Sequence, residues 1–223
     1  MRVVPEGIAD RLEAAALVFA DHGFDQTRIE DLAEATGIPR ATLYYYFAGK
    51  EDILAWLFRR MLVEVTEAVA VAVSGEGTAR DRLEAVVVAK VEVMGRHPAT
   101  CRALIADLGR AGRIPDIAAA IQAAFHHPVR RLLAEGEADG TLRPVGDPET
   151  TVSAVYGAVT TAANHYLVAD NHLDTDRVAT EVTAFLLGGL AADVRTGSDP
   201  AGEARSVPPG PEHQGRRPAR GRQ

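Results

Sequence analysis

Residues 27–50 have the sequence TRIEDLAEATGIPRATLYYYFAGK, whose pattern predicts a helix, a tight turn and a second helix. Thr27 and Glu30 have the spacing of a capping box, in which each side chain accepts a hydrogen bond from a backbone N–H in the first helical turn. Gly37 predicts the end of the first helix, because glycine adopts a left-handed backbone at little cost. Pro39 predicts the start of the second helix, where a missing N–H does no harm. The residues expected to face inward are Ile29, Leu32, Ala33, Ile38, Leu43 and Phe47.

The second predicted helix has outward residues that suit DNA. It carries three consecutive tyrosines, residues 44–46, which a stable globular helix has little reason to expose. In a major groove, Arg40 can fork onto a guanine, Ala41 and Thr42 can contact a thymine methyl, and tyrosine hydroxyls can bond phosphates. A helix-turn-helix places the first residues of its second helix against base edges. The pattern therefore indicates a DNA-binding motif.

The surrounding stretch, residues 23–54, resembles the N-terminal DNA-binding domain of the tetracycline-repressor (TetR) family of bacterial regulators. Its sequence is GFDQTRIEDLAEATGIPRATLYYYFAGKEDIL, and the resemblance has no gap. Three positions depart from the family pattern: Pro39 replaces a commoner serine, Ala41 a common glycine and Tyr46 a frequent histidine. The positions that agree are Gly23, Phe24, Thr27, Leu32, Ala33, Gly37, Ile38, Thr42, Leu43, Tyr44, Phe47 and Lys50.

The resemblance implies roles for individual residues of this motif. Base contacts are expected from Arg40, Thr42 and Tyr45, with Ala41 beside them. Phosphate contacts are expected from Arg28, Tyr44, Tyr46 and Lys50. For Tyr44, packing beneath the motif is an alternative that is compatible with phosphate contact, because a tyrosine can bury its ring and expose its hydroxyl.

The composition indicates a soluble, cytoplasmic protein. Its 223 residues are enough for one or two domains, and 47% are hydrophobic. The single Cys101 rules out an internal disulfide and fits a reducing compartment. Glu6 and Asp10 precede any apolar run, so no secretory signal is expected, and no run approaches the ~20 apolar residues that span a bilayer.

The charge balance opposes general nucleic-acid binding. The net charge is −7, and residues 1–50 carry five basic and eight acidic side chains. Arg28, Arg40 and Lys50 nevertheless gather at the motif, and a homodimer would double this positive patch. We therefore expect modest non-specific affinity and a clear dependence on salt.

The remaining pattern predicts an all-α fold of about nine helices. We expect a helix-turn-helix domain over residues 1–50, a helical ligand-binding and dimerisation domain over 51–195, and a disordered tail over 196–223. The helix expected over 50–72 has two apolar sides and connects the domains. Pro128 predicts a kink or break in the helix that begins near Pro115 and ends near Glu135, and residues 136–146 are expected to form a turn-rich connector.

The last two predicted helices carry small residues at four-residue spacing. These are Ala154, Ala158 and Ala162 in one helix, and Ala184, Gly188 and Ala192 in the other. Such spacing permits close helix approach, either within the chain or across a four-helix dimer interface. The resemblance favours the dimer, because TetR proteins dimerise through their final helices.

An effector site is expected within residues 75–195 and the connecting helix, as an apolar pocket with a few polar groups. Its candidates are Met61, Val87, Val91, Met94, Leu104, Ile121, Phe125, Tyr156 and Asn164, each of which is also a normal core residue. His97 and Cys101 are four residues apart, but a zinc site needs three or four convergent ligands. We therefore expect neither a metal nor another cofactor.

These observations favour a dimeric repressor that binds a palindromic double-stranded operator and releases it when a small molecule binds. Residues 135–143 resemble a connector common in TetR members that respond to lipophilic molecules. The sequence is also compatible with two alternative functions. One is an architectural DNA-binding dimer without an effector. The other is an enzyme on a helical fold, for which no nucleophile–base pair or metal cluster is visible in the sequence.

Overall fold

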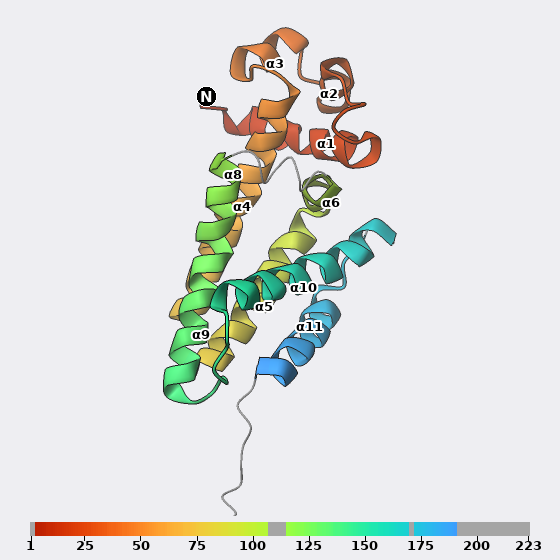
Figure 1. The fold of residues 1–223 in the computed structure, drawn as a ribbon. Coiled ribbons are helices and arrows are strands. Elements are labelled where there is room, and N and C mark those ends of the chain that lie inside the picture. Colours follow the sequence, from red (N-terminus) through yellow and green to blue (C-terminus); the bar gives the residue numbers. More distant parts are fainter. Residues whose placement is uncertain (1–2, 107–114, 170–171, 191–223) are drawn as a thin grey trace, which may run out of the picture. The chain divides into compact units, whose positions relative to one another are not determined.

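The computed structural model describes residues 3–106, 115–169 and 172–190. Within these ranges the chain forms helices and no strand, which confirms the all-α prediction (Figure 1). The number of helices also agrees with about nine if the unbroken run from α8 to α9 is counted once. The helices are α1 (Glu6–His22), α2 (Ile29–Thr36), α3 (Arg40–Tyr46), α4 (Lys50–Ser74), α5 (Ala79–Arg96), α6 (Pro98–Ala106), α8 (Pro115–Ile121), the π-helical segment η1 (Gln122–His126), α9 (His127–Asp139), α10 (Pro148–Ala169) and α11 (Thr175–Leu190).

Helices α1 to α3 share a small apolar core. Leu12 and Phe19 of α1, Leu32 of α2 and Leu43 of α3 are almost completely buried, as is Ile38 in the turn. Gly37 has a φ of +62°, as predicted for the residue that ends α2. The turn is further held by Arg11 of α1, whose side chain donates to the carbonyls of Thr36 and Gly37.

The predicted capping box at Thr27 is wrong. Thr27 is buried, and its hydroxyl donates to the Gly23 carbonyl at 2.7 Å instead of accepting from α2. The residue before α2 is Arg28, whose N–H donates to the Asp31 carboxylate at 2.8 Å. Asp31 therefore has the role that was predicted for Glu30, because the residue that precedes the helix is Arg28 and not Thr27.

Helix α4 connects α1–α3 with the rest of the described unit (Figure 1). Near its start, the Trp56 ring lies 6.3 Å from Phe47, between ring centroids. Arg60 forms ion pairs with Asp10 and Glu13 of α1 at 3.4 and 3.5 Å. Beyond Arg60 the helix packs along α5. The domain division at residue 50 remains a prediction, since α4 packs both against α1 and against the helices that follow it.

The helix expected to be kinked by Pro128 contains a π-helical segment. Proline has no N–H for an α-helical hydrogen bond to the carbonyl four residues earlier. Just before it, the His127 N–H bonds the Gln122 carbonyl across five residues. This segment buries the side chains of Ala124, Phe125 and His126. Helix α9 then continues through Gly136 to Asp139, so the connector is shorter than predicted.

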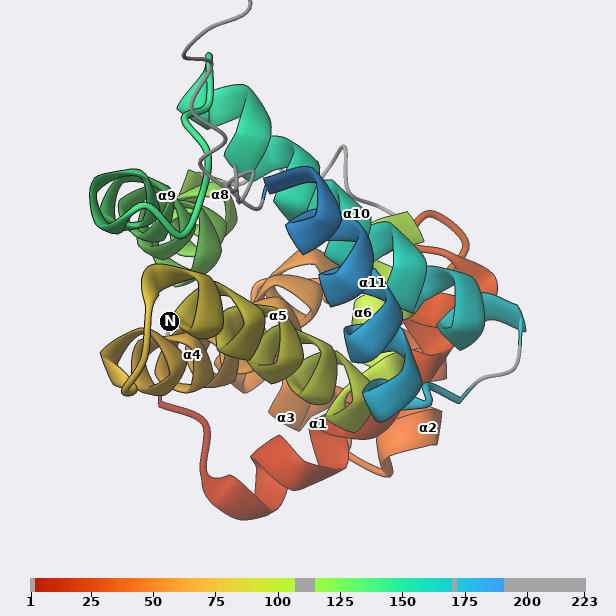
Figure 2. The ribbon, with the colours of Figure 1, turned by 90° about the horizontal axis from the view of Figure 1, so that it is seen from below.

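Helices α10 and α11 lie side by side, and α11 also packs on α5 (Figure 2). The Asp147 carboxylate caps the start of α10 by accepting from the Glu149 N–H at 3.1 Å, and Pro148 is the first helical residue. Asp174 caps α11 in the same way through the Arg177 N–H. The predicted tail over residues 196–223 lies outside the described residues.

Candidate functional site

The predicted recognition helix, α3, lies at one end of the described unit (Figure 1). Tyr44 and Tyr45 expose 57% and 58% of their surface, and Arg40 and Ala41 are also exposed. Tyr46 differs from the prediction of an outward tyrosine, because it is half-buried and packs against the core, with its ring edge-on to Tyr45 at 4.9 Å. The surface available to a groove is therefore built by Arg40, Ala41, Tyr44 and Tyr45, with Thr42 partly exposed.

Arg40 is paired with a carboxylate from the preceding helix. Its guanidinium donates to Glu30 at 2.6 Å, and both side chains are more than half exposed. The hydrogen bond from Arg40 lowers the pKa of Glu30 below its ordinary value. Because the pair is exposed and worth little, Arg40 can exchange Glu30 for a DNA base or phosphate.

Lys50 and Arg28 differ in their availability to phosphates. The Lys50 ammonium donates to the carbonyls of Phe24, Asp25 and Thr27 at 2.7, 3.1 and 2.8 Å, and lies 4.5 Å from the Phe24 ring centroid. It therefore fixes the turn before α2, and its phosphate contact remains a prediction. Arg28 is exposed beside this turn.

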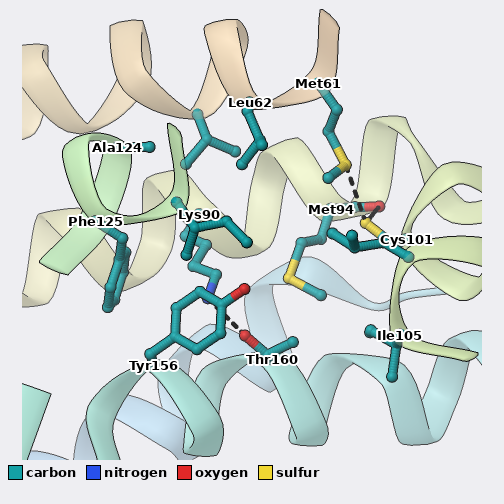
Figure 3. A pocket seen from close by; sticks show the side chains of 13 residues that line it. Met61, Leu62, Lys90, Met94, Cys101, Ile105, Ala124, Phe125, Tyr156 and Thr160 are labelled. Carbon is teal, nitrogen blue, oxygen red and sulfur yellow. Dashed lines mark hydrogen bonds between the residues drawn. The ribbon is translucent and has the colours of Figure 1, made fainter. Parts of the chain in front are cut away.

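A cavity lies between α4, α5, α6, the α8–η1 segment and α10 (Figure 3). Its volume is about 30 Å³, which is room for one or two water molecules. The lining residues are Met61, Leu62, Val65, Lys90, Met94, Cys101, Leu104, Ile105, Ile121, Ala124, Phe125, Tyr156 and Thr160. The wall is thus mostly apolar, with its polar groups grouped on one side.

The structure brings together most of the predicted pocket residues. Six of them line this cavity, namely Met61, Met94, Leu104, Ile121, Phe125 and Tyr156. Val87 and Val91 are instead buried core residues away from the lining. Asn164 is also outside the lining, with a buried side-chain oxygen that accepts no hydrogen bond from the described residues.

Lys90 is the charged lining residue that the sequence-based prediction did not include. Its side chain is 5% exposed, and its ammonium donates to the Thr160 hydroxyl at 2.6 Å. The ammonium lies 3.6 Å from the Tyr156 ring centroid and 4.4 Å from that of Phe125 (Figure 3). Its position was detectable, since Lys90 lies four residues from both Val86 and Met94, on the apolar face of α5.

Burial shifts the ionisation of every titratable group in this wall. It lowers the pKa of Lys90 to about 7 and raises that of the Cys101 thiol to about 12. It also raises the pKa of Tyr156. The thiol and the phenol are therefore neutral near pH 7, and neither balances a charge on Lys90.

His97 and Cys101 contact different partners. Cys101 points inward, with its thiol 3.4 Å from the Met61 sulfur, whereas His97 contacts Glu64 of α4 at 2.9 Å. Across the described ranges, no three His, Cys, Asp or Glu side chains converge as metal ligands.

Two family models match the chain on either side of the middle of α4. Residues 12–57 match the model for bacterial regulatory proteins of the tetR family, and residues 76–190 match the tetracyclin repressor-like C-terminal domain. The chain belongs to the TetR family. This TetR-family chain is therefore a DNA-binding transcriptional regulator, as residues 23–54 predicted.

Individual TetR-family relatives align with most of this chain. The fatty acid metabolism regulator protein of Bacillus subtilis is 22% identical over 184 residues, covering 80% of this chain and 93% of the relative. The structure of the ketosteroid transcriptional regulator KstR2 of Mycobacterium tuberculosis has a TM-score of 0.74 at 23% identity, covering 86% and 98% of the two chains. FadR from Bacillus subtilis, solved with stearoyl-CoA, has a TM-score of 0.67 at 20% identity, covering 81% and 98%. At these identities the solved structures establish a common fold.

None of the helices in residues 3–106, 115–169 and 172–190 has the length and apolar character needed to cross a membrane.

Proposed function

We propose that this TetR-family regulator binds a palindromic operator as a homodimer and releases it when a small lipophilic molecule enters the cavity beside Lys90. The observation that carries the proposal is the position of α4, which contributes to the cavity wall and also holds the DNA-binding helices. A repressor needs such a shared element, because a ligand shifts an equilibrium only through different affinities for its two states.

The physical connection runs through neighbouring residues of α4. Met61 lines the cavity, and the preceding residue, Arg60, forms ion pairs with α1. A further ion pair joins Arg102 of α6 to Asp21 of α1 at 3.2 Å. Because the cavity holds only one or two waters, a lipophilic molecule must displace its walls. Movement of α4 and α6 would then change the position of α1–α3.

Homodimerisation through α10 and α11 is supported by their outward faces. Phe185 of α11 exposes 76% of its surface, and Val168 of α10 exposes 64%. Ala154 and Ala184, from the predicted small-residue stripes, are also exposed. Pairing these faces with a symmetry mate would remove the apolar side chains from water and form a four-helix interface.

The lipophilic class of ligand is supported by the cavity wall and by the relatives. The lining side chains are mainly methionine, leucine, isoleucine, valine and phenylalanine, and methionines adapt readily to different apolar shapes. The relatives include a fatty acid metabolism regulator, a ketosteroid regulator and a FadR solved with stearoyl-CoA. Release by a lipophilic molecule is the mechanism that accounts for both observations.

The test is operator binding by the full chain. In a gel-shift series with the DNA that flanks its own gene, the chain should retard a fragment that contains a palindrome. The two half-sites of this palindrome should lie one helical turn, ~34–36 Å, or a multiple of that apart. Decanoate, decan-1-ol and decanoyl-CoA are suitable probes, and at least one should weaken binding by about 5–150-fold. Tight operator binding that no such probe alters would instead favour an effector-less architectural dimer.

A further inference from the structure

The cavity wall contains a basic side chain, Lys90, whose charged form no acidic group of the described residues neutralises. Lys90 is almost fully buried, and no Asp or Glu of the described residues lies within ion-pair distance of its ammonium. Its only hydrogen-bond partner among these residues is the Thr160 hydroxyl. A buried charge is normally paired or hydrogen-bonded on all sides. An ammonium in this state needs an additional acceptor.

The groups around Lys90 do not supply a negative charge. The titratable groups facing it are Cys101 of α6, His126 of η1 and Tyr156 of α10. Burial raises the pKa of the thiol and the phenol and lowers the pKa of His126, so all three are neutral near pH 7. The cavity-lining residues of α4 and α8 are apolar, and no described carboxylate of α9 or α11 pairs with Lys90.

The polar groups of the cavity form one cluster. Lys90, Thr160 and Tyr156 come together where α5 faces α10, with the Lys90 ammonium hydrogen-bonded to Thr160 and lying against the Tyr156 ring (Figure 3). The opposite walls are apolar, with Leu62 and Val65 on α4 and Leu104 and Ile105 on α6. A ligand that satisfies both regions has an apolar body and one oxygen-bearing end.

We infer that the cavity takes an apolar molecule that ends in a carboxylate, with the carboxylate bound by the Lys90 ammonium and the adjacent Thr160 and Tyr156 hydroxyls. One ammonium balances one negative charge, so a carboxylate is matched, whereas a phosphate dianion would keep an unpaired buried charge. A neutral alcohol would leave the ammonium without its counter-charge. This inference rests on the proposed ligand-responsive function and specifies the chemistry of the same cavity.

The inference also predicts a proton linked to binding. Because burial holds the pKa of Lys90 at about 7, the free protein at pH 8 carries mostly the neutral amine. A bound carboxylate favours the ammonium and raises this pKa. Carboxylate binding at pH 8 should therefore take up nearly one proton, and affinity should fall as the pH rises above 7.

The experiment is calorimetric titration of the full chain with decanoate, decan-1-ol and decanoyl-CoA. We expect decanoate to bind at least about tenfold more tightly than decan-1-ol at pH 7, as is typical of a hydrogen bond to a charged group. Lys90→Met, which keeps the apolar length, should remove this preference. Arg130→Met removes a positive charge outside the cavity, on α9, and should keep the preference. In two buffers of different ionisation enthalpy at pH 8, the unmodified chain should take up close to one proton per decanoate.

Three results would overturn the inference. They are equal affinity for decanoate and decan-1-ol, a decanoate preference that survives Lys90→Met, and a preference for decanoyl-CoA over decanoate that survives the same change. The proton-uptake measurement needs no variant, so absent uptake counts against the inference even if Lys90→Met fails to fold. If decan-1-ol releases the operator while the carboxylate preference is absent, this inference fails and the proposed function stands. If no probe releases the operator, the proposed function fails, whatever the calorimetry gives.

Discussion

Among single residues, Arg40 tests the DNA-binding surface most directly. It is exposed at the start of α3 and pairs only with the exposed Glu30 among the described residues. Arg40→Ala should weaken operator binding by about tenfold or more, since a bidentate arginine–guanine contact is worth roughly 1–3 kcal/mol. Fluorescence anisotropy with the operator at fixed salt measures this change.

Arg130→Ala is the matched control for Arg40→Ala. Arg130 is also an exposed arginine paired with a glutamate, Glu149 at 2.8 Å, but it belongs to α9. The Arg130→Ala variant should bind the operator with an affinity within about twofold of that of the unmodified chain, because it loses one weak surface ion pair. Equal losses in the two variants would show that Arg40 acts only through general charge.

Lys90 should make the stability of this regulator depend on pH. Its pKa is about 7 in the folded chain and near 10.4 when unfolded, so between these values the unfolded state binds more protons. Stability therefore rises with pH over this window, by at most ~1.4 kcal/mol per unit from this residue. The Lys90→Met variant should not show this rise of stability with pH, and it should be more stable than the unmodified chain at pH 7. Urea unfolding at pH 7, 8 and 9 measures both effects.

The unmodified chain and the variant must be compared at the same protein concentration, because dimerisation contributes to apparent stability. If the free energy of unfolding depends on pH in the same way in the two chains, Lys90 does not have a pKa lowered by burial. A variant that is less stable than the unmodified chain at pH 7 would show that the Lys90–Thr160 hydrogen bond outweighs the penalty of burying the amine.

At the level of elements, the end of α9 depends on one glycine. A Cβ at Gly136 would lie 2.5 Å from the Leu142 Cδ1 atom, and Leu142 also donates to the Gly136 carbonyl. Gly136→Ala should therefore destabilise the fold by ~1–3 kcal/mol, the usual range for overpacking, although alanine favours helix. Thermal or urea unfolding measures the change.

The Gly7→Ala variant in α1 is the control that separates the steric clash at Gly136 from the effect of helix propensity. A Cβ at Gly7 meets nothing within 4 Å, so this change should stabilise the chain by up to about 1 kcal/mol. If both variants are stabilised, Leu142 does not pack tightly against α9.

The same elements show which local features a sequence can predict. The starts of α10 and α11 depend on Asp147 and Asp174, whose capping acts within three residues. The start of α2 was misplaced because both Thr27 and Arg28 precede an acidic residue at capping distance, and burial of Thr27 decided between them. The π-helical form of η1 was beyond prediction. Pro128 indicates a distortion, but packing of Phe125 and His126 selects its form.

For the whole molecule, the exposed face of α11 should form the homodimer interface. Phe185→Glu places a charge where the proposed interface buries an aromatic ring, so it should shift the chain towards monomer and weaken operator binding. Light scattering after size-exclusion chromatography, together with operator titration, measures both effects. A dimer that persists with Phe185→Glu would place the interface elsewhere.

Val71→Glu is the control for this change. Val71 is similarly exposed, at 73% against 76% for Phe185, but it lies on α4. It should alter neither mass nor operator affinity.

The sequence by itself determined the all-α fold, the helix-turn-helix and the TetR family, because these depend on apolar spacing, caps and turn residues that act within a few positions. It also identified six of the cavity residues, since a large apolar side chain on an inward face is visible as a pattern. Only the tertiary structure decided that the Lys90 ammonium meets Thr160 and Tyr156, that Tyr46 packs inward and that Lys50 binds main-chain carbonyls. Each of these depends on contacts between residues far apart in the chain, where burial and the available partners determine the direction and ionisation of a polar side chain.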